Sequence, residues 1–198
     1  MGHQFELMTP DIDFEEAFSA QTACYISNFA QFIQRLLKKK QLSAPPEDLI
    51  EPINIRIWQR GIDMSYSERW KMQDAFNRIS RSLGQFFQSW DLILTPTFSK
   101  PTPLLGEKKY LTLSDNPDVM DWFYSLWDIF SYTPLASLTG TPGISLPLAW
   151  QESGLPLGMH FQTRQGNDGL LLQLAAQLER ASGGRFIRHS TPEVHVTR

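Results

Sequence analysis

Residues 138–163 read LTGTPGISLPLAWQESGLPLGMHFQT, and this stretch decides the fold class. Its start, residues 139–143, is rich in Thr, Gly and Pro, which is typical of a turn. Apolar runs follow at residues 144–150 and 157–163, with QESG among the residues between them. They predict two adjacent strands with a hairpin-like connection, although Pro147 weakens part of the first strand because proline donates no backbone hydrogen bond.

Helical periodicity flanks these strands. After them, leucines recur over residues 168–181, and a Gly-Gly pair ends the predicted helix. Before them, Ser65 and Glu68 have the spacing of a capping box, which predicts the start of a long aromatic helix. Pro46 can occupy the first turn of a shorter helix that Gly61 ends. We therefore expect further helices over residues 14–37, 46–60, 65–90 and 118–130.

A third strand is predicted at residues 91–95, where a continuous apolar run ends at Pro96. Residues 98–117 are rich in Pro, Gly, Lys and Ser and are typical of an irregular loop. The sequence therefore predicts an α/β fold with a small mixed sheet flanked by several amphipathic helices. Three strands are few for so much apolar helix surface, so we expect the sheet to continue in polypeptide that is missing here. Residues 1–182 are expected to form a single domain, and residues 183–198 a loose tail.

The charge balance is close to neutral, because 18 Lys and Arg residues stand against 21 Asp and Glu residues. Such a chain has no field that would attract nucleic acid or anionic lipid, and no apolar stretch has the length of a membrane span. Cys24 is the single cysteine, which excludes an internal disulfide, and its place among Phe, Tyr and Ile predicts a buried structural thiol. We expect a soluble, cytoplasmic protein without nucleic-acid or membrane partners.

The residues that could carry other chemistry favour structural roles. His3, His160, His189 and His195 lack the spacing of metal ligands, for which two histidines four apart on a helix would be typical. Ser145 lies in a predicted strand, and the motif around it lacks the second glycine of a nucleophile elbow. The sequence therefore predicts neither a metal site nor a cofactor.

Three segments resemble the C-terminal part of amidase-signature enzymes, the family of amidases and amidotransferase A subunits. These segments are residues 90–97 (WDLILTPT), residues 138–147 (LTGTPGISLP) and residues 154–162 (GLPLGMHFQ). Residues 1–5 (MGHQF) resemble the start of a further strand in the same enzymes. The resemblance implies a partial amidase-signature fold over nearly the whole chain, up to about residue 182.

The resemblance also implies a reaction for which this sequence lacks the residues. Complete members of the family cleave amide C–N bonds with a Ser–Ser–Lys triad, in which a neutral lysine acts through a bridging serine on the nucleophile. That triad lies upstream of the portion represented here. The sequence holds no Gly-Gly-Ser-Ser-type stretch, and its one Gly-Gly pair precedes Arg185. No catalytic residue can therefore be carried over to this chain.

Residues 122–132 form an aromatic cluster with two interpretations. Packing in the core is one, because large rings bury much apolar area. The resemblance implies the other, in which this region forms a wall of the substrate pocket. On that interpretation the substrate-binding residues are Trp127, Phe130 and Thr133, and in an incomplete enzyme they would line an incomplete cleft.

Three functional hypotheses follow. The first is a C-terminal fragment or domain of an amidase that is inactive alone because the catalytic region is absent. The second is a stand-alone, non-catalytic module that reuses the fold to bind a partner protein or itself. The third is an amidase that is active as it stands, although its nucleophile and base are not visible. Because missing polypeptide should leave apolar surface uncovered, we expect a homo-oligomer, and a separately encoded N-terminal amidase half is a further candidate partner.

Overall fold

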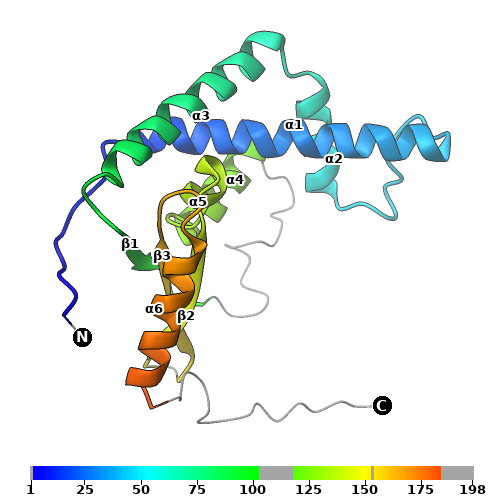
Figure 1. The fold of residues 1–198 in the computed structure, drawn as a ribbon. Coiled ribbons are helices and arrows are strands. Elements are labelled where there is room, and N and C mark those ends of the chain that lie inside the picture. The colour runs from blue at the N-terminus through cyan, green and yellow to red at the C-terminus, as the bar shows by residue number, and fades with distance from the viewer. Residues whose placement is uncertain (1, 103–117, 153, 184–198) are drawn as a thin grey trace, which may run out of the picture.

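The computed structural model describes residues 2–102, 118–152 and 154–183. Figure 1 shows a helical layer arranged around one long helix, α1 (Phe14–Lys40), with a small sheet below it. A single helix, α6 (Asp168–Ala181), lies along the sheet, and the structure confirms the bounds predicted for it. The predicted tail, residues 184–198, lies outside the described residues, and the single domain over residues 1–182 stays a prediction.

Helix α1 begins and ends where its terminal groups favour it. The Asp13 side chain accepts a hydrogen bond from the backbone N–H of Glu16, and three lysines in the last turn complement the helix dipole. Gln41 then adopts a left-handed backbone with φ 56°, and its N–H closes the last turn. The predicted helix over residues 14–37 is confirmed, and it continues to Lys40.

Helix α2 (Pro52–Ile62) lies against α1 at Gly61. The two backbones are so close that a Cβ at residue 61 would lie 2.6 Å from the Ile26 carbonyl oxygen and would overlap the Ala30 side chain. The prediction that this helix starts at Pro46 and ends at Gly61 is wrong at both ends, because residues 47–50 form a turn and Gly61 lies inside the helix. The glycine therefore serves close packing between helices and does not end one.

Helix α3 (Tyr66–Phe86) begins with the predicted capping box. Ser65 Oγ accepts a hydrogen bond from the Glu68 N–H, and the Glu68 carboxylate accepts one from the Ser65 N–H at 2.8 Å. Arg60 donates a further bond to Glu68 at 2.6 Å, and it lowers the pKa of Glu68 to about 2 together with the bonds from Ser65. The helix stops at Phe86, earlier than predicted, because a turn over residues 87–89 leads into the sheet.

The sheet has three described strands in the order β1-β3-β2: β1 (Ile93–Pro96), β2 (Gly143–Trp150) and β3 (Pro156–Gln162). The predicted α/β class with a small sheet is confirmed. Both described pairs are antiparallel, so the expected mixed character is not seen among these strands, because β1 and β2 each run opposite to the central β3. Pro147 is tolerated because β2 pairs with β3 on one side and its register shifts between Pro147 and Ala149.

Two short helices connect the helical layer to the sheet. Helix α4 (Val119–Ile129) starts at the predicted Asp118 cap, and α5 (Pro134–Thr139) follows after a short connection at residues 130–133. The Phe18 ring of α1 stacks on Tyr124 with ring centroids 4.5 Å apart and meets Trp127 edge-on at 4.9 Å. On α5, Leu138 packs with alanines of α1 and α3. These contacts hold the C-terminal half of the chain against the helical layer.

The helices and the sheet keep separate hydrophobic cores. The sheet cluster joins Leu146 and Phe161 of the strands to Leu171 and Leu174 of α6. Three other clusters lie among the helices, and none of them contains a buried residue of the three described strands. The face of the sheet opposite α6 is therefore available to line a cavity.

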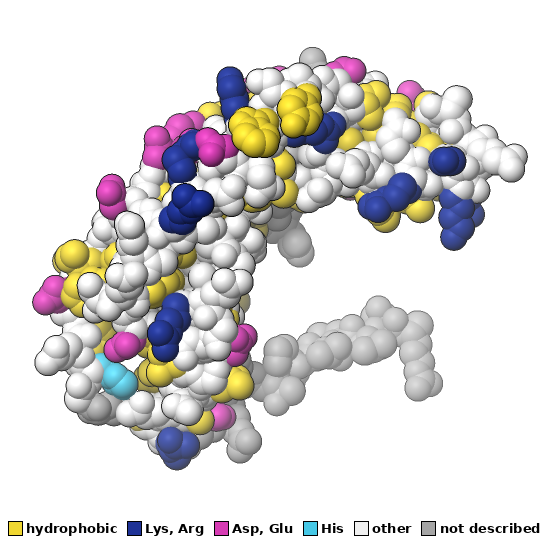
Figure 2. Space-filling view, turned by 45° about the horizontal axis from the view of Figure 1, so that its top comes forward, with side chains coloured by type: hydrophobic (Ala, Val, Ile, Leu, Met, Phe, Trp, Pro, Cys, Tyr) yellow, Lys and Arg dark blue, Asp and Glu magenta, His cyan; other side chains and the backbone are white. Residues whose placement is uncertain are grey.

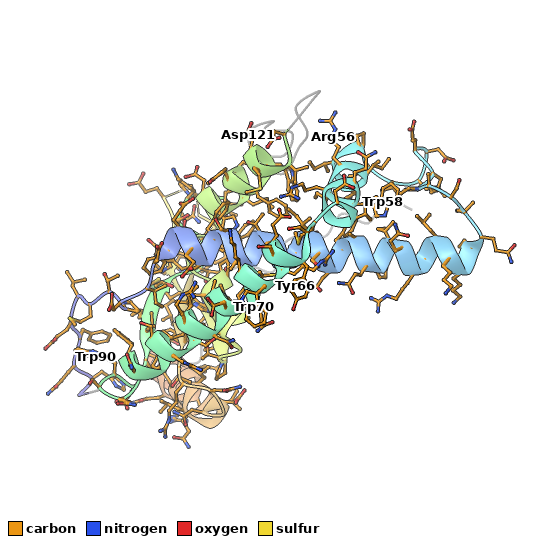
Figure 3. All side chains as sticks on the ribbon, turned by 90° about the horizontal axis from the view of Figure 1, so that it is seen from above. Arg56, Trp58, Tyr66, Trp70, Trp90 and Asp121 are labelled. Carbon is orange, nitrogen blue, oxygen red and sulfur yellow. The ribbon has the colours of Figure 1, made fainter. Side chains whose placement is uncertain are left out.

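Several large apolar side chains remain exposed. Tyr66 and Trp70 are 79% and 64% exposed, and Figure 3 shows them near one another along α3. Figure 2 shows hydrophobic side chains in separate places on the face it presents, among Lys, Arg, Asp and Glu side chains of both signs. Exposed rings on a helix whose opposite side is packed mark a surface that could contact another polypeptide.

The N-terminal arm, residues 2–10, carries three more exposed large apolar side chains, Phe5, Leu7 and Met8. The resemblance of residues 1–5 to the start of a strand is not matched by a strand, because no described strand lies in register beside the arm. Extended backbone becomes a strand only when a neighbour accepts and donates its hydrogen bonds. The arm is thus a strand-like sequence without a partner in the described part of the chain.

The glycine in the helix contact generates a prediction with a matched control. We expect Gly61→Ala to lower the free energy of unfolding by about 1–3 kcal/mol, because the new methyl group must push α1 and α2 apart. Gly84→Ala, on the exposed side of α3 with nothing within 4 Å of the new Cβ, should raise it by about 0.5–1 kcal/mol. Urea unfolding followed by circular dichroism measures both, and a neutral Gly61→Ala would contradict the packing role.

Candidate functional site

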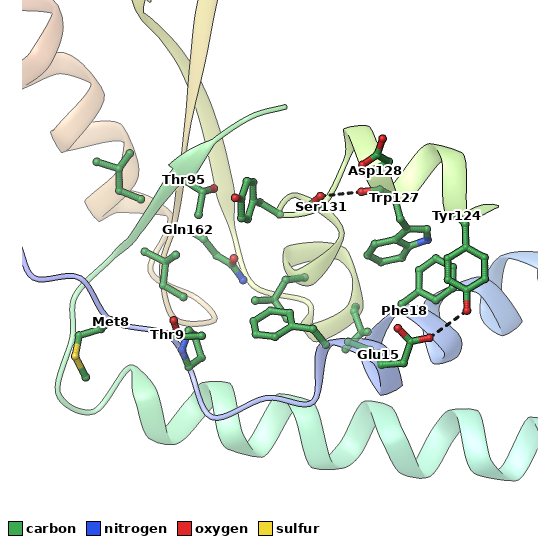
Figure 4. Close-up of a pocket in the computed structure, with 18 residues that line it drawn as sticks. Met8, Thr9, Glu15, Phe18, Thr95, Tyr124, Trp127, Asp128, Ser131 and Gln162 are labelled. Atoms are coloured by element: carbon green, nitrogen blue, oxygen red, sulfur yellow. Dashed lines mark hydrogen bonds between the residues drawn. The ribbon is translucent and has the colours of Figure 1, made fainter. Parts of the chain in front are cut away.

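A cavity of about 630 Å³ lies where the helical layer meets the sheet. The N-terminal arm and the start of α1 form one side, α4 and α5 form the second, and β1 with the end of β3 forms the floor, as Figure 4 shows. The lining residues are Met8, Thr9, Pro10, Phe14, Glu15, Ala17, Phe18, Ile93, Leu94, Thr95, Tyr124, Trp127, Asp128, Ser131, Tyr132, Leu135, Leu138 and Gln162. Most of this surface is apolar.

The charged groups at the rim of the cavity have partners. The Glu15 carboxylate accepts a hydrogen bond from the Tyr124 hydroxyl at 3.1 Å, and this bond raises the pKa of Tyr124 above its ordinary value. Asp128 forms an ion pair with Lys100 at 3.1 Å. The charges of the lining residues are therefore confined to the rim on the α1 and α4 side, and the floor of the cavity is neutral.

Gln162 is a polar side chain at the floor, and a chain of hydrogen bonds fixes its orientation. Thr139 donates its single hydroxyl proton to the Leu135 carbonyl at 2.7 Å, so it must accept from Thr141 at 2.9 Å. Thr141 has then used its own proton and must accept from the Gln162 amide nitrogen at 2.6 Å. The amide is 2% exposed and cannot flip without losing one of these bonds.

Thr95 lies beside Gln162 on the same face of the sheet. Gln162 pairs with Ile93, two residues before Thr95 on β1, so the two side chains are diagonal neighbours. The Thr95 hydroxyl oxygen is buried and has no hydrogen-bond partner among the described residues. Figure 4 shows both side chains on the side of the sheet that faces Trp127 and Ser131. A buried hydroxyl without a partner is rare in folded proteins and calls for an explanation.

The structure places the three residues predicted to bind substrate in different surroundings. Trp127 lines the cavity, whereas Phe130 and Thr133 are not among its lining residues. Phe130 ends α4 and turns its ring edge-on to Phe98, with centroids 5.3 Å apart. Thr133 precedes the first turn of α5 as its N-cap. The three residues are close in sequence, but α4 ends between Trp127 and Phe130, so their side chains have different surroundings.

The sequence alone does not single out Gln162 or Thr95 as site residues. Both lie at or near the ends of the apolar runs 91–95 and 157–163 that predict strands. The available signal was the alternation along a strand, because one-sided burial by α6 leaves every second residue facing the cavity. Their diagonal proximity depends on the register of β1 against β3, in which Thr95 pairs with His160 and Gln162 with Ile93, and the sequence of either strand alone does not contain that register.

Other residues with reactive side chains have structural surroundings. Ser145 lies in β2, and its hydroxyl contacts that of Thr97 at 2.5 Å. Cys24 is only half-buried, so the prediction of a buried thiol is wrong in degree. This partial burial raises the pKa of the thiol, and the hydrogen bond from Asn28 opposes the rise less strongly, so the thiol keeps its proton. Among the described residues, no group of three or more His, Cys, Asp and Glu side chains is placed to hold a metal ion. His189 and His195 lie outside the described residues.

No helix in the described ranges is both long enough and apolar enough to span a membrane.

Comparisons with known proteins then identify the fold. A family model described as Amidase matches residues 2–172. The chain is 43% identical over 104 residues to the putative amidase AmiC of Mycobacterium leprae (strain TN). This aligned stretch covers 52% of this chain and 21% of that protein. It is 36% identical over 93 residues to the 6-aminohexanoate-cyclic-dimer hydrolase of Paenarthrobacter ureafaciens, covering 46% of this chain and 19% of the hydrolase.

A solved structure of 6-aminohexanoate cyclic dimer hydrolase is similar over 91% of this chain, with a TM-score of 0.77 and 26% identity. The similarity covers 38% of that protein. A bacterial aryl acylamidase of the amidase signature family is similar in fold, with a TM-score of 0.65 and 18% identity. The chain thus matches about a fifth of the length of the curated relatives and over a third of the solved hydrolase.

The buried histidine of the sheet generates a pH prediction. His160 is buried on β3, and burial lowers its pKa below the ordinary value of 6.5. The unfolded chain therefore takes up a proton at this residue at a higher pH than the folded chain does, so stability should fall as pH is lowered through 6.5. We expect His160→Gln to lose part of the stability difference that the wild type shows between about pH 7.5 and about pH 5.5.

Urea unfolding at the two pH values measures this difference. His3→Gln, in the exposed arm, is the matched control and should keep the wild-type pH dependence. An equal pH dependence in wild type and His160→Gln would exclude a neutral, buried histidine as a contributor to stability.

Proposed function

The chain belongs to the amidase family, whose model matches residues 2–172, and on that premise we propose that it is the C-terminal portion of an amide-hydrolysing enzyme and is inactive alone. The observation that carries the proposal is the pairing of an amidase fold with a sequence that lacks the family's reaction centre. The similarity to the solved hydrolase covers 91% of this chain and 38% of that protein. The segments that resemble the family belong to the part that follows its catalytic region.

Amide hydrolysis needs groups that this sequence does not supply. An amide carbonyl is attacked by a nucleophile that a base must activate, and the oxyanion that forms must be stabilised by hydrogen-bond donors. In the family these roles belong to a Ser–Ser–Lys triad in a Gly/Ser-rich region. The present sequence has no Gly-Gly-Ser-Ser-type stretch to which that triad could be assigned.

The contribution of this chain to the complete enzyme would be one wall of the substrate pocket. The cavity beside Trp127 is large enough for a small organic molecule and is mostly apolar, with polar groups at its floor. Trp127 provides an aromatic wall for such a ligand. Phe130 and Thr133 keep their proposed substrate-binding role only if the missing polypeptide extends the pocket beyond the end of α4.

A second candidate function is favoured by the exposed apolar side chains. A non-catalytic module that binds a partner or itself would present such a surface, and the exposed arm carries Phe5 and Leu7 on backbone that belongs to no helix or strand. Both β1 and β2 have one side without a described neighbour. An extended arm can add to such an edge in a second copy of the chain, which would produce a homo-oligomer. A separately encoded N-terminal amidase half could occupy the same surfaces.

The proposed lack of activity is tested with the purified chain. We expect no hydrolysis of a panel of aryl and aliphatic amides, and no labelling by a serine-reactive fluorophosphonate, because the sequence has no Gly-Gly-Ser-Ser-type stretch that would supply the family's activated serine. A complete amidase of the family, assayed in parallel, controls for the substrates and the probe. Turnover together with labelling at a single serine would contradict the proposal, and Ser145 would then be the first residue to replace by alanine.

Self-association is tested by light scattering at micromolar concentration. We expect a dimer or larger species, and we expect the double substitution Phe5→Ser and Leu7→Ser to shift it toward monomer. Tyr66→Ser with Trp70→Ser is the comparison variant, because these side chains are also exposed but lie on a helix; a shift to monomer with this pair alone would assign the contact to α3 and not to the arm. A monodisperse wild-type monomer would rule out the self-association module.

A further inference from the structure

We propose that this chain associates head to tail: the basic, apolar end of α1 in one copy inserts into an acidic, methionine-lined groove beside the start of α1 in a second copy. The inference extends the self-association considered above to a second pair of surfaces, which does not include the arm. It depends neither on the missing catalytic region nor on the cavity beside Trp127.

The groove has a volume of about 490 Å³ and lies between the first half of α1, the first half of α3 and the end of α2. Its lining residues are Asp13, Glu15, Glu16, Ser19, Ala20, Thr22, Ala23, Ile26, Arg60, Met64, Glu68, Lys71, Met72, Ala75 and Met120. Many of these side chains are small, so another chain can approach closely. The three methionines are flexible and polarisable, so they can adapt to an inserted apolar side chain.

The charges of the groove favour a cation. Ion pairs with arginines neutralise Glu16 and Glu68. Asp13 and Glu15 accept hydrogen bonds but form no ion pair among the described residues. Lys71 also lines the groove without a described ion pair, so two negative charges stand against one positive charge. A basic group that enters on the α1 side meets the two carboxylates.

Thr22 gives the groove an unsatisfied polar group. This residue is 2% exposed and lines the groove, and its hydroxyl oxygen has no hydrogen-bond partner in the described part of the chain. A buried hydroxyl without a partner is destabilising, and native structures rarely keep one without a reason. An ammonium group from a second copy would donate a hydrogen bond to it.

The end of α1 has the complementary chemistry. Phe32 and Leu36 lie four residues apart on one face of the helix and are 50% and 40% exposed. Arg35 and residues 38–40, which are all lysines, are exposed beside them and form no ion pair within the described ranges. Figure 1 shows this end of α1 extending past α2 and α3, and Figure 2 shows Lys and Arg side chains around the projecting end of the molecule.

The end of α1 cannot reach the groove of its own chain. Ser19 in the groove and Lys39 lie on one continuous helix and are roughly 30 Å apart along it, at about 1.5 Å per residue. A second copy is therefore the occupant that this sequence itself supplies. The contact is head to tail because two different surfaces of the chain meet in it.

The first test measures association of the arm variant Phe5→Ser with Leu7→Ser, in which the arm contact is removed. Sedimentation velocity over a range of micromolar concentrations should show a mass that grows with concentration. The apparent dissociation constant should rise at least about tenfold between about 50 mM and about 500 mM salt, because salt screens exposed charges. An arm variant that is monomeric at low salt, or whose association does not depend on salt, would overturn the proposal.

Two further variants, each made in the arm variant, disable one surface at a time. Ser19→Arg places a cation in the groove, and Phe32→Gln with Leu36→Gln removes the apolar side chains from the end of α1. Each variant alone should be monomeric, whereas an equal mixture should form a heterodimer, because each supplies the surface that the other lacks. Gln73→Arg adds the same charge at an exposed position of α3 outside the groove lining, and as the matched control it should associate like the arm variant. A mixture that stays monomeric would refute the head-to-tail contact.

Lys71→Glu tests the charge complementarity in the opposite direction. It replaces a cation of the groove by an anion, so the dissociation constant should fall by at least about threefold. Unchanged or weaker association would contradict the proposal. Failure here is distinct from failure of the proposed function, because hydrolysis of amides by this chain would refute the inactivity and leave the head-to-tail contact standing.

Discussion

The close contact between α1 and α2 at Gly61 is the constraint on which the helical layer depends. Because the helices meet backbone to backbone there, α2 must lie against Ile26 and Ala30 of α1. Arg69 of α3 then bonds both the Gly61 carbonyl oxygen and the Ser27 hydroxyl of α1. One arginine thus ties three helices together at the point of closest approach, and its bonds are short-range and directional.

The cavity follows from the way the two halves of the molecule are joined. The sheet buries its apolar face under α6, and the helices bury theirs against each other, so the halves share contacts but no common core. The junction is made by the rings of Phe18, Tyr124 and Trp127 and by α5. The space that remains is lined by those rings and by the free face of the sheet.

Local sequence signals predicted the elements, and tertiary contacts decided what the sequence could not reveal. The capping box at Ser65 involves residues of a single helical turn, and the leucine periodicity of residues 168–181 defines one face of a single helix. Both signals are local, and both predictions are confirmed. The prediction for Gly61 was wrong because a single sequence cannot distinguish two kinds of glycine. One ends a helix, and the other lies within a helix where a second helix packs closely against it. The sequence predicted the same role for Trp127 and Phe130, but in the structure only Trp127 of the two lines the cavity. Phe130 lies at the end of α4, and its ring packs against Phe98 instead. The register that brings Thr95 beside Gln162 joins segments far apart in the chain, and no local pattern encodes it.

The pairing of β1 with β3 has a consequence for the order in which the molecule is made. Helices α2 and α3 both pack against α1, which precedes them in the chain, so the three can assemble before the sheet is synthesised. β1 follows them directly, but its neighbour in the sheet is synthesised only after α4, α5 and β2. During that interval β1 presents unpaired backbone beside a finished helical layer. The nascent chain therefore passes through a stage in which its apolar strand is exposed, and this stage is the one most open to capture by a chaperone or by another chain.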